Sequence, residues 1–358
     1  MNAMSDVEAD LIVRREGAVG VARLNRPKTI NALTLEMTRD FERALASFAA
    51  DPAIALALVE GAGERGLCAG GDIRGLYDSA RAKGDLGKVF WREEYILNAR
   101  IAQFPKPYVA YMDGLVMGGG VGLAAHGSHR IVTDKTKVGM PEVGIGFFPD
   151  VGGTWLLSRA PGEIGTYFGL TGQTMNGADA VYSGFADFYV PSAKWPDLRT
   201  ALTALPASAG AAQVAGLIRS FAEKPEPAIA QQHRQQIDAL FGHDTIEDIV
   251  AALRADRSDF AQATLEALAG KSPTSLKVAL KLLRQARTAT SLQECLVREY
   301  RAALQVFESD DFIEGVRAAI IDKDRQPKWQ PSLVEDVTPQ IVARYFADRG
   351  SDELVFPN

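Results

Sequence analysis

Two glycine-rich turns, each between an apolar strand-like segment and a helical one, limit most strongly the folds open to this chain. The first is GLCAGGDI (Gly66 to Ile73), which follows the apolar segment ALALVEG (Ala55 to Gly61). The second is DGLVMGGGVGL (Asp113 to Leu123), which follows Tyr108 to Met112. Glycine lets the backbone approach a ligand closely, and free N–H groups at a helix start can bind an oxyanion. Two such turns are what a carbonyl group needs in order to be polarised from two directions.

The pattern along the chain predicts an α/β fold. Residues 10–24 alternate apolar and polar side chains around a Glu-Gly turn, which is typical of a β-hairpin. Thr34 can cap a helix that runs to Ala50, and another helical stretch covers 86–102. After about Pro191 helical periods dominate, for example over 245–269. We therefore expect an α/β catalytic core over residues 1–190 and a helical C-terminal region over 191–358.

Composition excludes several classes of protein. Of the 358 residues, 47% are hydrophobic, which is enough for a large core. The net charge of -6 provides no basic field, so we expect no nucleic-acid partner, whereas a small anionic ligand needs only local positive charge. No run approaches the roughly 18 apolar residues of a membrane span. The acidic start MNAMSDVEAD resembles neither a signal peptide nor an organelle presequence, and we expect a cytoplasmic protein.

Two carboxylates lie in unusually apolar surroundings. Within VGMPEVGIGFFPDVGGT, Glu142 and Asp150 each follow a proline. Apolar neighbours raise the pKa of a carboxyl group by desolvation, which is how a general acid or base is tuned. Asp150 can equally cap the helix that follows it. A further acid, Glu94 or its neighbour Glu93, interrupts an apolar helical face, and only one of the two can point into a pocket; a solvated acid beside an arginine is the alternative.

Other hydrolytic chemistries find no support. The chain has neither a G-x-S-x-G elbow nor an H-E-x-x-H zinc motif. Cys68 and Cys295 are too far apart to suggest a disulfide framework or a metal site, and Cys68 has no obvious base beside it. His126 and His129 straddle a predicted helix end and are interpreted as structural. The sequence therefore predicts neither a metal nor a serine or cysteine nucleophile.

These motifs resemble the crotonase (enoyl-CoA hydratase/isomerase) superfamily over nearly the whole chain. The matching segments are LNRPKTINAL, CAGGDI, the GGG run at 118–120 and MPEVGIGFFPDVGGT. Together with KSPTSLK (271–277) and DFIEGVRAAIIDKDRQPKW (311–329), they resemble the 3-hydroxyisobutyryl-CoA hydrolase branch. The resemblance implies a spiral of β-β-α units with a helical C-terminal region. It also implies an acyl-CoA substrate and no separate cofactor, and it allows a homo-oligomer, since relatives often associate.

The resemblance assigns roles to individual residues. The two N–H groups of the oxyanion hole fall on Gly71 and Gly119, and the catalytic acids on Glu142 and Asp150. Glu94 matches an acid that holds the acyl portion of the substrate. The residues implied to contact CoA are Arg26 and Lys28 near its phosphates and Ala69, Gly70, Asp72 and Ile73 near its adenine.

The implied reaction is hydrolysis of a short 3-hydroxyacyl-CoA, by preference 3-hydroxyisobutyryl-CoA in valine catabolism. Glu142 would either attack the thioester carbonyl to give an acyl anhydride or activate water. Asp150 would hold the substrate 3-hydroxyl or position the leaving group. Hydratases of the superfamily use another glutamate at the position of Gly122, which disfavours a hydratase here. An enoyl-CoA hydratase or isomerase and a non-catalytic acyl-CoA-binding protein are the alternatives.

Overall fold

The computed structural model describes residues 9–357 and begins with the predicted hairpin. β1 (Leu11–Glu16) and β2 (Val19–Leu24) pair antiparallel. The first helix, α1 (Leu35–Ala50), starts where the sequence predicts, because Thr34 Oγ1 accepts a hydrogen bond from Met37 N at 3.2 Å. Its apolar face, which includes Phe41 and Leu45, is buried. The hairpin and this helix are therefore confirmed.

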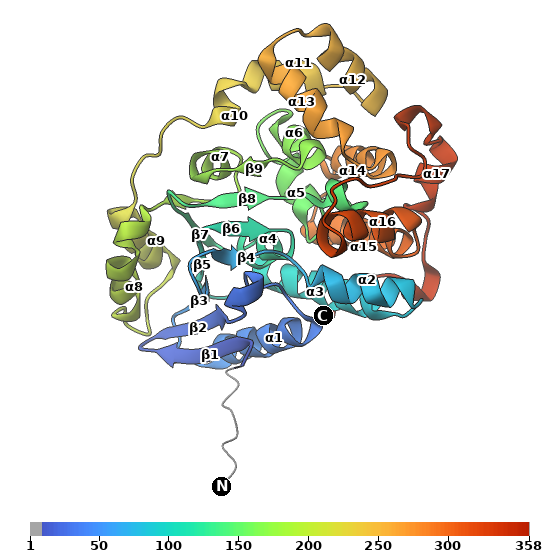
Figure 1. Ribbon diagram of the computed structural model, residues 1–358. Helices are drawn as coiled ribbons and strands as arrows, with labels where there is room; N and C mark the ends of the chain where they lie inside the picture. Colours follow the sequence, from blue (N-terminus) through green and yellow to red (C-terminus); the bar gives the residue numbers. More distant parts are fainter. Residues whose placement is uncertain (1–8, 358) are drawn as a thin grey trace.

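Two sheets occupy the centre of the molecule (Figure 1). The larger has the order β1-β2-β3-β5-β7-β10 and is parallel except for the β1–β2 pair. The smaller has the order β4-β6-β8-β9, with only β9 antiparallel. The chain passes from one sheet to the other between β3 and β4, β5 and β6, and β7 and β8, which gives a spiral of β-β-α units and confirms the predicted class. The bounds are β3 Leu56–Gly61, β4 Gly66–Cys68, β5 Tyr108–Met112, β6 Leu115–Met117, β7 His129–Val132, β8 Lys137–Gly139, β9 Thr174–Met175 and β10 Phe188–Tyr189.

The helices that follow these strands carry the glycine turns. After β4, the chain forms α2 (Ile73–Arg81) and α3 (Leu86–Ala102), and after β6 it forms α4 (Gly119–Ala124). β4 and β6 lie within the two glycine-rich segments that the sequence suggested to be turns. Because β4 pairs with β6, the two turns that follow these strands lie at the same edge of the smaller sheet.

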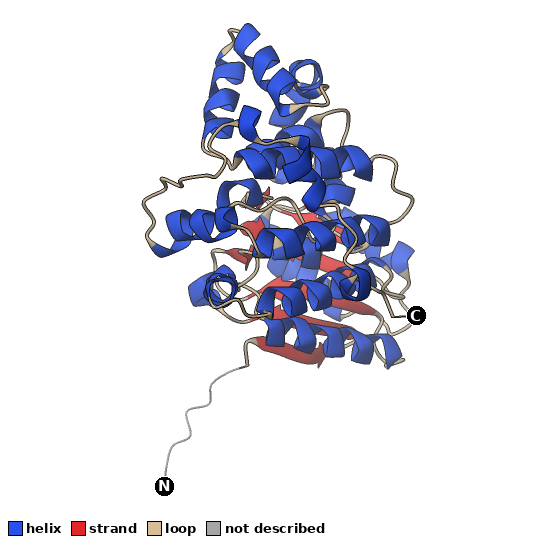
Figure 2. Ribbon diagram, turned by 90° about the vertical axis from the view of Figure 1, so that its right-hand side faces the viewer, coloured by secondary structure: helices blue, strands red, loops and turns tan. Residues whose placement is uncertain are grey.

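Helices cover the outer face of the larger sheet. Side chains of β2, β3, β5 and β7 form a buried apolar layer there, which packs against α8 (Trp195–Thr203) and α9 (Ala211–Phe221). Figure 1 shows these two helices on one side of the sheets and α1 to α3 on the other, and Figure 2 shows the strands behind a layer of helices. Because both faces are covered, strands such as β2 are buried almost throughout.

The C-terminal half is helical, as predicted, and packs directly on the core. α15 (Leu292–Phe307) contacts α3, and α14 (Pro273–Ala286) contacts α5 (Gly153–Ser158) and α6 (Ile164–Thr171). The helical pattern over 245–269 is interrupted at Ser258, which caps the second of two helices. The division near Pro191 stays a prediction. The other bounds are α7 Gly177–Tyr182, α10 Ile229–Gln232, α11 Arg234–Phe241, α12 Ile246–Ala255, α13 Asp259–Ala269, α16 Asp310–Val316 and α17 Pro339–Arg344.

Within residues 9–357, no helix combines the length and the apolar character that crossing a membrane would require.

Candidate active site

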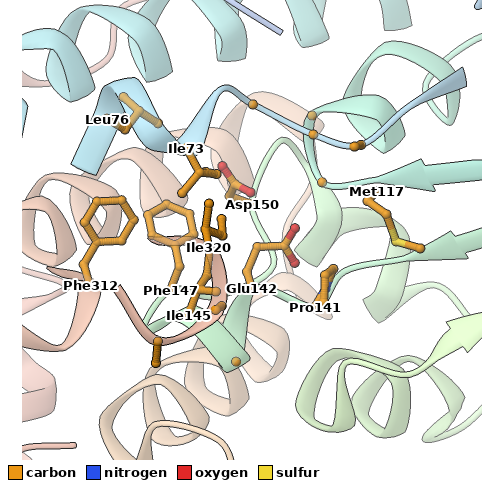
Figure 3. A pocket seen from close by; sticks show the side chains of 18 of the residues that line it. Ile73, Leu76, Met117, Pro141, Glu142, Ile145, Phe147, Asp150, Phe312 and Ile320 are labelled. Atoms are coloured by element: carbon orange, nitrogen blue, oxygen red, sulfur yellow. The ribbon is translucent and has the colours of Figure 1, made fainter. Parts of the chain in front are cut away.

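A cavity of about 620 Å³ opens between the two glycine turns and the C-terminal region. Its size suits a ligand that is largely enclosed by protein. Figure 3 shows Glu142 and Asp150 in this pocket, with Phe147, Phe312 and Ile73 toward one side and Met117 toward the other. The lining also includes the turn residues Ala69, Gly70, Gly71, Gly118 and Gly119, the acid Glu94, and Lys271 and Arg325 of the C-terminal region.

The two glycine turns lie in contact. A β-carbon added to Gly119 would lie 3.4 Å from Gly71 N, and one added to Gly70 would lie 3.8 Å from Gly119 N. In the described part of the chain, neither Gly71 N–H nor Gly119 N–H donates to an internal acceptor. The Gly71 turn is fixed by its neighbours, because Leu33 N donates to Gly70 O and Asp72 N to Leu33 O. Two free N–H groups therefore stand side by side at the pocket wall.

Three carboxylates line the same pocket. Glu94, Glu142 and Asp150 are each at most 8% exposed. Oε1 of Glu94 would lie 2.6 Å from a β-carbon at Gly119, and Oε1 of Glu142 would lie 2.7 Å from one at Gly118. The glycine run is therefore needed for steric reasons, because any side chain at these two positions would collide with an acid.

Burial changes the ionisation of all three acids. Desolvation, followed by repulsion from Asp150, raises the pKa of Glu94 and of Glu142 well above the ordinary range. Desolvation also raises the pKa of Asp150 to about 7, although a hydrogen bond from Tyr95 opposes this rise. Asp150 accepts a hydrogen bond from Tyr95, whereas one oxygen of Glu94 and one of Glu142 have no partner within residues 9–357. Burial is thus the main cause of the raised pKa of each acid.

The structure decides two alternatives that the sequence left open. Glu94 lines the pocket, whereas Glu93 points outward and pairs with Arg39 at 2.7 Å. Asp150 does not cap α5, because its Oδ2 accepts the hydroxyl hydrogen of Tyr95 at 2.7 Å. Its carboxylate is thus available to the pocket.

Gly122 has no space for a side chain. A β-carbon there would lie 2.7 Å from Asn98 Nδ2 and 2.8 Å from Val151 Cβ. Both neighbours are buried in the core. The resemblance implies that hydratases of the superfamily have a glutamate at this position. This fold cannot accommodate one without moving α3 or the loop that carries Asp150.

We predict that Gly122→Glu destabilises the fold by about 3 kcal/mol or more, because it overpacks the site and buries an unpaired carboxyl group. Denaturant-induced unfolding measures the change. Gly216→Glu is the matched control, since Gly216 lies on the exposed face of α9 with no atom within 4 Å of its β-carbon position. A Gly122→Glu protein of unchanged stability that hydrates crotonyl-CoA would contradict this explanation.

Not every residue implied to bind CoA lies at the pocket. Ala69, Gly70 and Ile73 line it, but Arg26, Lys28 and Asp72 are outside its lining. The Arg26 guanidinium is already engaged, because it donates to Ala32 O at 2.6 Å and lies 3.4 Å from an oxygen of Asp72. Lys28 is exposed on the short helical turn Pro27–Thr29. The contact of these three residues with CoA stays a prediction.

Sequence reasoning missed four residues of the site. Tyr95 donates to Asp150, and Glu299 on α15 holds the backbone that follows Asp150. Lys271 and Arg325 line the pocket. The sequence did offer a signal for three of them. Tyr95 directly follows Glu94, and Lys271 and Arg325 lie in the two C-terminal motifs quoted above. Glu299 had none, because an acid in an amphipathic helix ordinarily faces solvent.

Cys68 and His126 are structural. Burial raises the pKa of the Cys68 thiol to about 12 and lowers the pKa of His126 to about 4. The His126 ring donates through Nε2 to Val151 O at 2.7 Å. Burial and these pKa shifts disfavour a nucleophilic role for Cys68 and a basic role for His126.

Two free N–H groups beside buried acids, in a pocket of this size, are the arrangement expected of an enzyme site that acts on a carbonyl group. The chain belongs to the enoyl-CoA hydratase/isomerase family, whose model matches residues 19–346. It is 42% identical to the mouse 3-hydroxyisobutyryl-CoA hydrolase, mitochondrial, over 99% of this chain and 93% of that protein.

Two solved structures are similar along their whole length. The carnitinyl-CoA dehydratase from Mycobacterium thermoresistibile has a TM-score of 0.92 and 45% identity, covering 98% of this chain and 99% of its own. The enoyl-CoA hydratase from Rhodobacter sphaeroides has a TM-score of 0.89 and 42% identity, and the match covers 97% of this chain and 100% of that chain. The crotonase-like fold is thereby confirmed.

The expected cytoplasmic location is wrong. The mouse protein and other curated relatives are named as mitochondrial enzymes. The expectation depended on the first ten residues, of which 1–8 lie outside the described part of the chain. The lack of a presequence pattern there was too weak a basis for a location.

Proposed function

We propose that the protein hydrolyses a short 3-hydroxyacyl-CoA thioester, by preference 3-hydroxyisobutyryl-CoA, to the free acid and CoA. The observation that carries the proposal is the pairing of Glu142 and Asp150 in one pocket with the free N–H groups of Gly71 and Gly119, while Gly122 leaves no space for another acid. The name of the mouse relative supports the same reaction.

The chemistry begins at the thioester carbonyl. Its oxygen would accept hydrogen bonds from Gly71 N–H and Gly119 N–H, which stabilise the negative charge that develops when the carbon is attacked. Glu142 would supply the attacking group, either its own carboxylate or a water from which it removes a proton. The bond to sulfur then breaks, and the CoA thiolate leaves and takes up a proton.

The two versions of this step differ in the source of one oxygen. If Glu142 attacks, an anhydride forms and water must later hydrolyse it, which can place a solvent oxygen in the Glu142 carboxylate. If Glu142 acts as a base, solvent oxygen enters only the acid product. Single turnover in heavy-oxygen water, followed by mass spectrometry of the peptide containing Glu142, distinguishes them.

Asp150 would hold the 3-hydroxyl group or position the leaving group, and Glu94 would contact the acyl portion. Both are buried beside the reacting position, and Asp150 is oriented by Tyr95. Phe90, Trp91 and Phe147 form an apolar wall that suits a short branched acyl chain.

The names of the two solved structures favour a hydratase as the second candidate. Loss of crotonyl-CoA absorbance measures hydration, and release of CoA thiol measures hydrolysis. We expect thiol release from 3-hydroxyisobutyryl-CoA and no hydration of crotonyl-CoA. Hydration without thiol release would favour the hydratase. If the protein catalyses neither reaction, a binding protein without catalysis would be favoured.

We propose that Lys271 and Arg325 bind the CoA phosphates, in addition to the predicted turn that carries Arg26 and Lys28. They are the two cationic side chains of the described residues that line the pocket. Lys271 Nζ would lie 3.4 Å from a β-carbon at Gly172 and 3.6 Å from one at Gly144, and no carboxylate of residues 9–357 pairs with it. Lys271 also precedes the cap of α14, where the helix dipole favours an anion.

We predict that Lys271→Gln lowers kcat/KM for the CoA thioester about tenfold, because it removes a charged hydrogen bond to phosphate. The same acyl group on pantetheine, which has no phosphate, should react within twofold of wild type. Lys224→Gln, an exposed lysine between α9 and α10, is the control. A tenfold loss for Lys28→Gln with none for Lys271→Gln would instead favour the turn predicted from the sequence.

The proposal also includes a role in valine catabolism, no cofactor other than the CoA of the substrate, and self-association, all of which rest on the resemblance.

A further inference from the structure

Glu299 lies on α15, far along the chain from the acids of the pocket, and it is fully buried. Its Oε2 accepts a hydrogen bond from Gly152 N at 2.7 Å, and its Oε1 accepts one from Thr154 N at 3.1 Å and another from the Thr154 hydroxyl. One carboxyl group therefore accepts hydrogen bonds from two backbone N–H groups and from the Thr154 hydroxyl in the turn that directly follows Asp150. The proposed reaction gives Glu299 no contact with the substrate, since it is not in the pocket lining.

The turn that Glu299 holds is strained. Val151 has φ 52°, a left-handed conformation that β-branched residues very rarely adopt, and Gly152 follows with φ 76°. Such a conformation costs about 1–3 kcal/mol and persists only where the surroundings enforce it. The His126 ring, which donates to Val151 O, and the Glu299 carboxylate are the surroundings that do so here.

The same helix also supports the other side of Asp150. Tyr300, the residue after Glu299, makes an edge-to-face contact with Tyr95, with ring centroids 6.3 Å apart. Tyr95 in turn donates to Asp150 Oδ2. The backbone at 152–154, directly after Asp150, is thus held by Glu299, and the Asp150 carboxylate is held by Tyr95, which packs against Tyr300.

We propose that Glu299 is a positioning residue, which fixes the turn after Asp150 so that the Asp150 carboxylate faces the substrate. This inference rests on the proposed hydrolysis, because it assumes that Asp150 contributes to turnover. Its consequence is that the helical C-terminal region takes part in forming the catalytic site rather than only covering it.

The substitution Glu299→Gln tests this with almost no change in volume. The amide nitrogen of glutamine would face a backbone N–H instead of accepting from it, so the turn loses part of its support. We expect kcat to fall about 100-fold while KM stays within about threefold. Glu308→Gln, an exposed acid at the end of the same helix, is the matched control and should leave both unchanged.

A double-mutant cycle with Asp150→Asn separates positioning from general stability. If Glu299 acts through Asp150, the double variant should be no slower than Asp150→Asn alone, within about threefold. If the two losses multiply, Glu299 does not act through Asp150 and the inference is wrong. Thr154→Val, which removes only the hydroxyl donor, should repeat the result in a milder form if Glu299→Gln folds poorly.

Hydrogen exchange gives a readout that needs no turnover. We expect Glu299→Gln to speed exchange of the amides at 150–156 and to leave those at 66–73 unchanged. Equal protection of 150–156 in both proteins would overturn the inference. A wild-type protein that releases no thiol but shows this local change would refute the proposed hydrolysis and leave the structural part of the inference standing.

Discussion

Glu142→Gln should reduce release of CoA from 3-hydroxyisobutyryl-CoA by about 1,000-fold, because an amide can neither attack the carbonyl nor accept a proton from water. Glu142 is 8% exposed, and its carboxylate faces the glycine run. Steady-state thiol release measures the effect. Glu93→Gln, one residue before Glu94 but outside the pocket, is the matched control and should keep activity within about threefold.

The same substitution should not harm the fold. Because burial raises the pKa of Glu142 in the folded state, the folded protein holds this proton more tightly than the unfolded chain does. The stability that this proton contributes is present at low pH and is lost as the pH rises through the folded-state pKa. At pH 7 to 8 the variant should therefore melt no lower than wild type, and about 1 kcal/mol of added stability is expected for such a site. Activity near wild type would show that the catalytic assignment is wrong.

Gly119→Ala should lower kcat/KM by about 100-fold or more, which is the usual effect of losing one donor of an oxyanion hole. The new methyl group would lie 2.6 Å from Glu94 Oε1 and 3.1 Å from a methyl carbon of Leu33, so Glu94, Leu33 or the backbone at Gly119 must shift. Each of these shifts would disturb the pocket wall at the proposed carbonyl site, because Glu94 and Gly119 both line the pocket.

Gly216→Ala is the control for this prediction, because its β-carbon position has no neighbour within 4 Å. The measurement should be made on a CoA thioester and on the same acyl group attached to pantetheine. Equal losses on both substrates locate the effect at the carbonyl. A loss confined to the CoA thioester would mean that Gly119 serves CoA binding instead of carbonyl polarisation.

The sequence predicted the elements whose signal is local. The hairpin, the Thr34 cap and the helical second half follow from alternation, capping chemistry and helical periods. The smaller sheet could not be predicted in this way, because β4 and β6 have three residues each and β9 has two. Such short strands form only because neighbouring strands supply their hydrogen-bond partners.

The site was predicted unevenly for a similar reason. Glu142 and Asp150 could be singled out because each follows a proline among apolar residues, and the structure places both in the pocket, although their roles stay predictions. Choosing Glu94 over Glu93 required the orientation of α3 about its axis, which a one-residue difference in sequence cannot supply. Glu299 lies in a segment that reads as an ordinary surface helix, and only the tertiary contact between α15 and the turn at 152–154 shows its buried position.

The cations that line the pocket differ from the two that the resemblance assigns to CoA, whose contact with CoA stays a prediction. Arg26 and Lys28 were assigned by resemblance, but the structure leaves them outside the pocket lining and brings Lys271 and Arg325 there instead. Trp329 Nε1 donates to Gly270 O at 3.3 Å, which joins the two C-terminal motifs that carry these cations. Neither motif alone predicts that Lys271 and Arg325 both line the pocket.

In the proposed reaction, Glu142 and the two glycine N–H groups together bring about hydrolysis of a 3-hydroxyacyl thioester. Thiol release from 3-hydroxyisobutyryl-CoA, followed in parallel for wild type and Glu142→Gln, tests it most directly. We predict rapid release by wild type, with a decrease of about 1,000-fold in the variant. No release by correctly folded wild type, or equal release by both proteins, would contradict the claim.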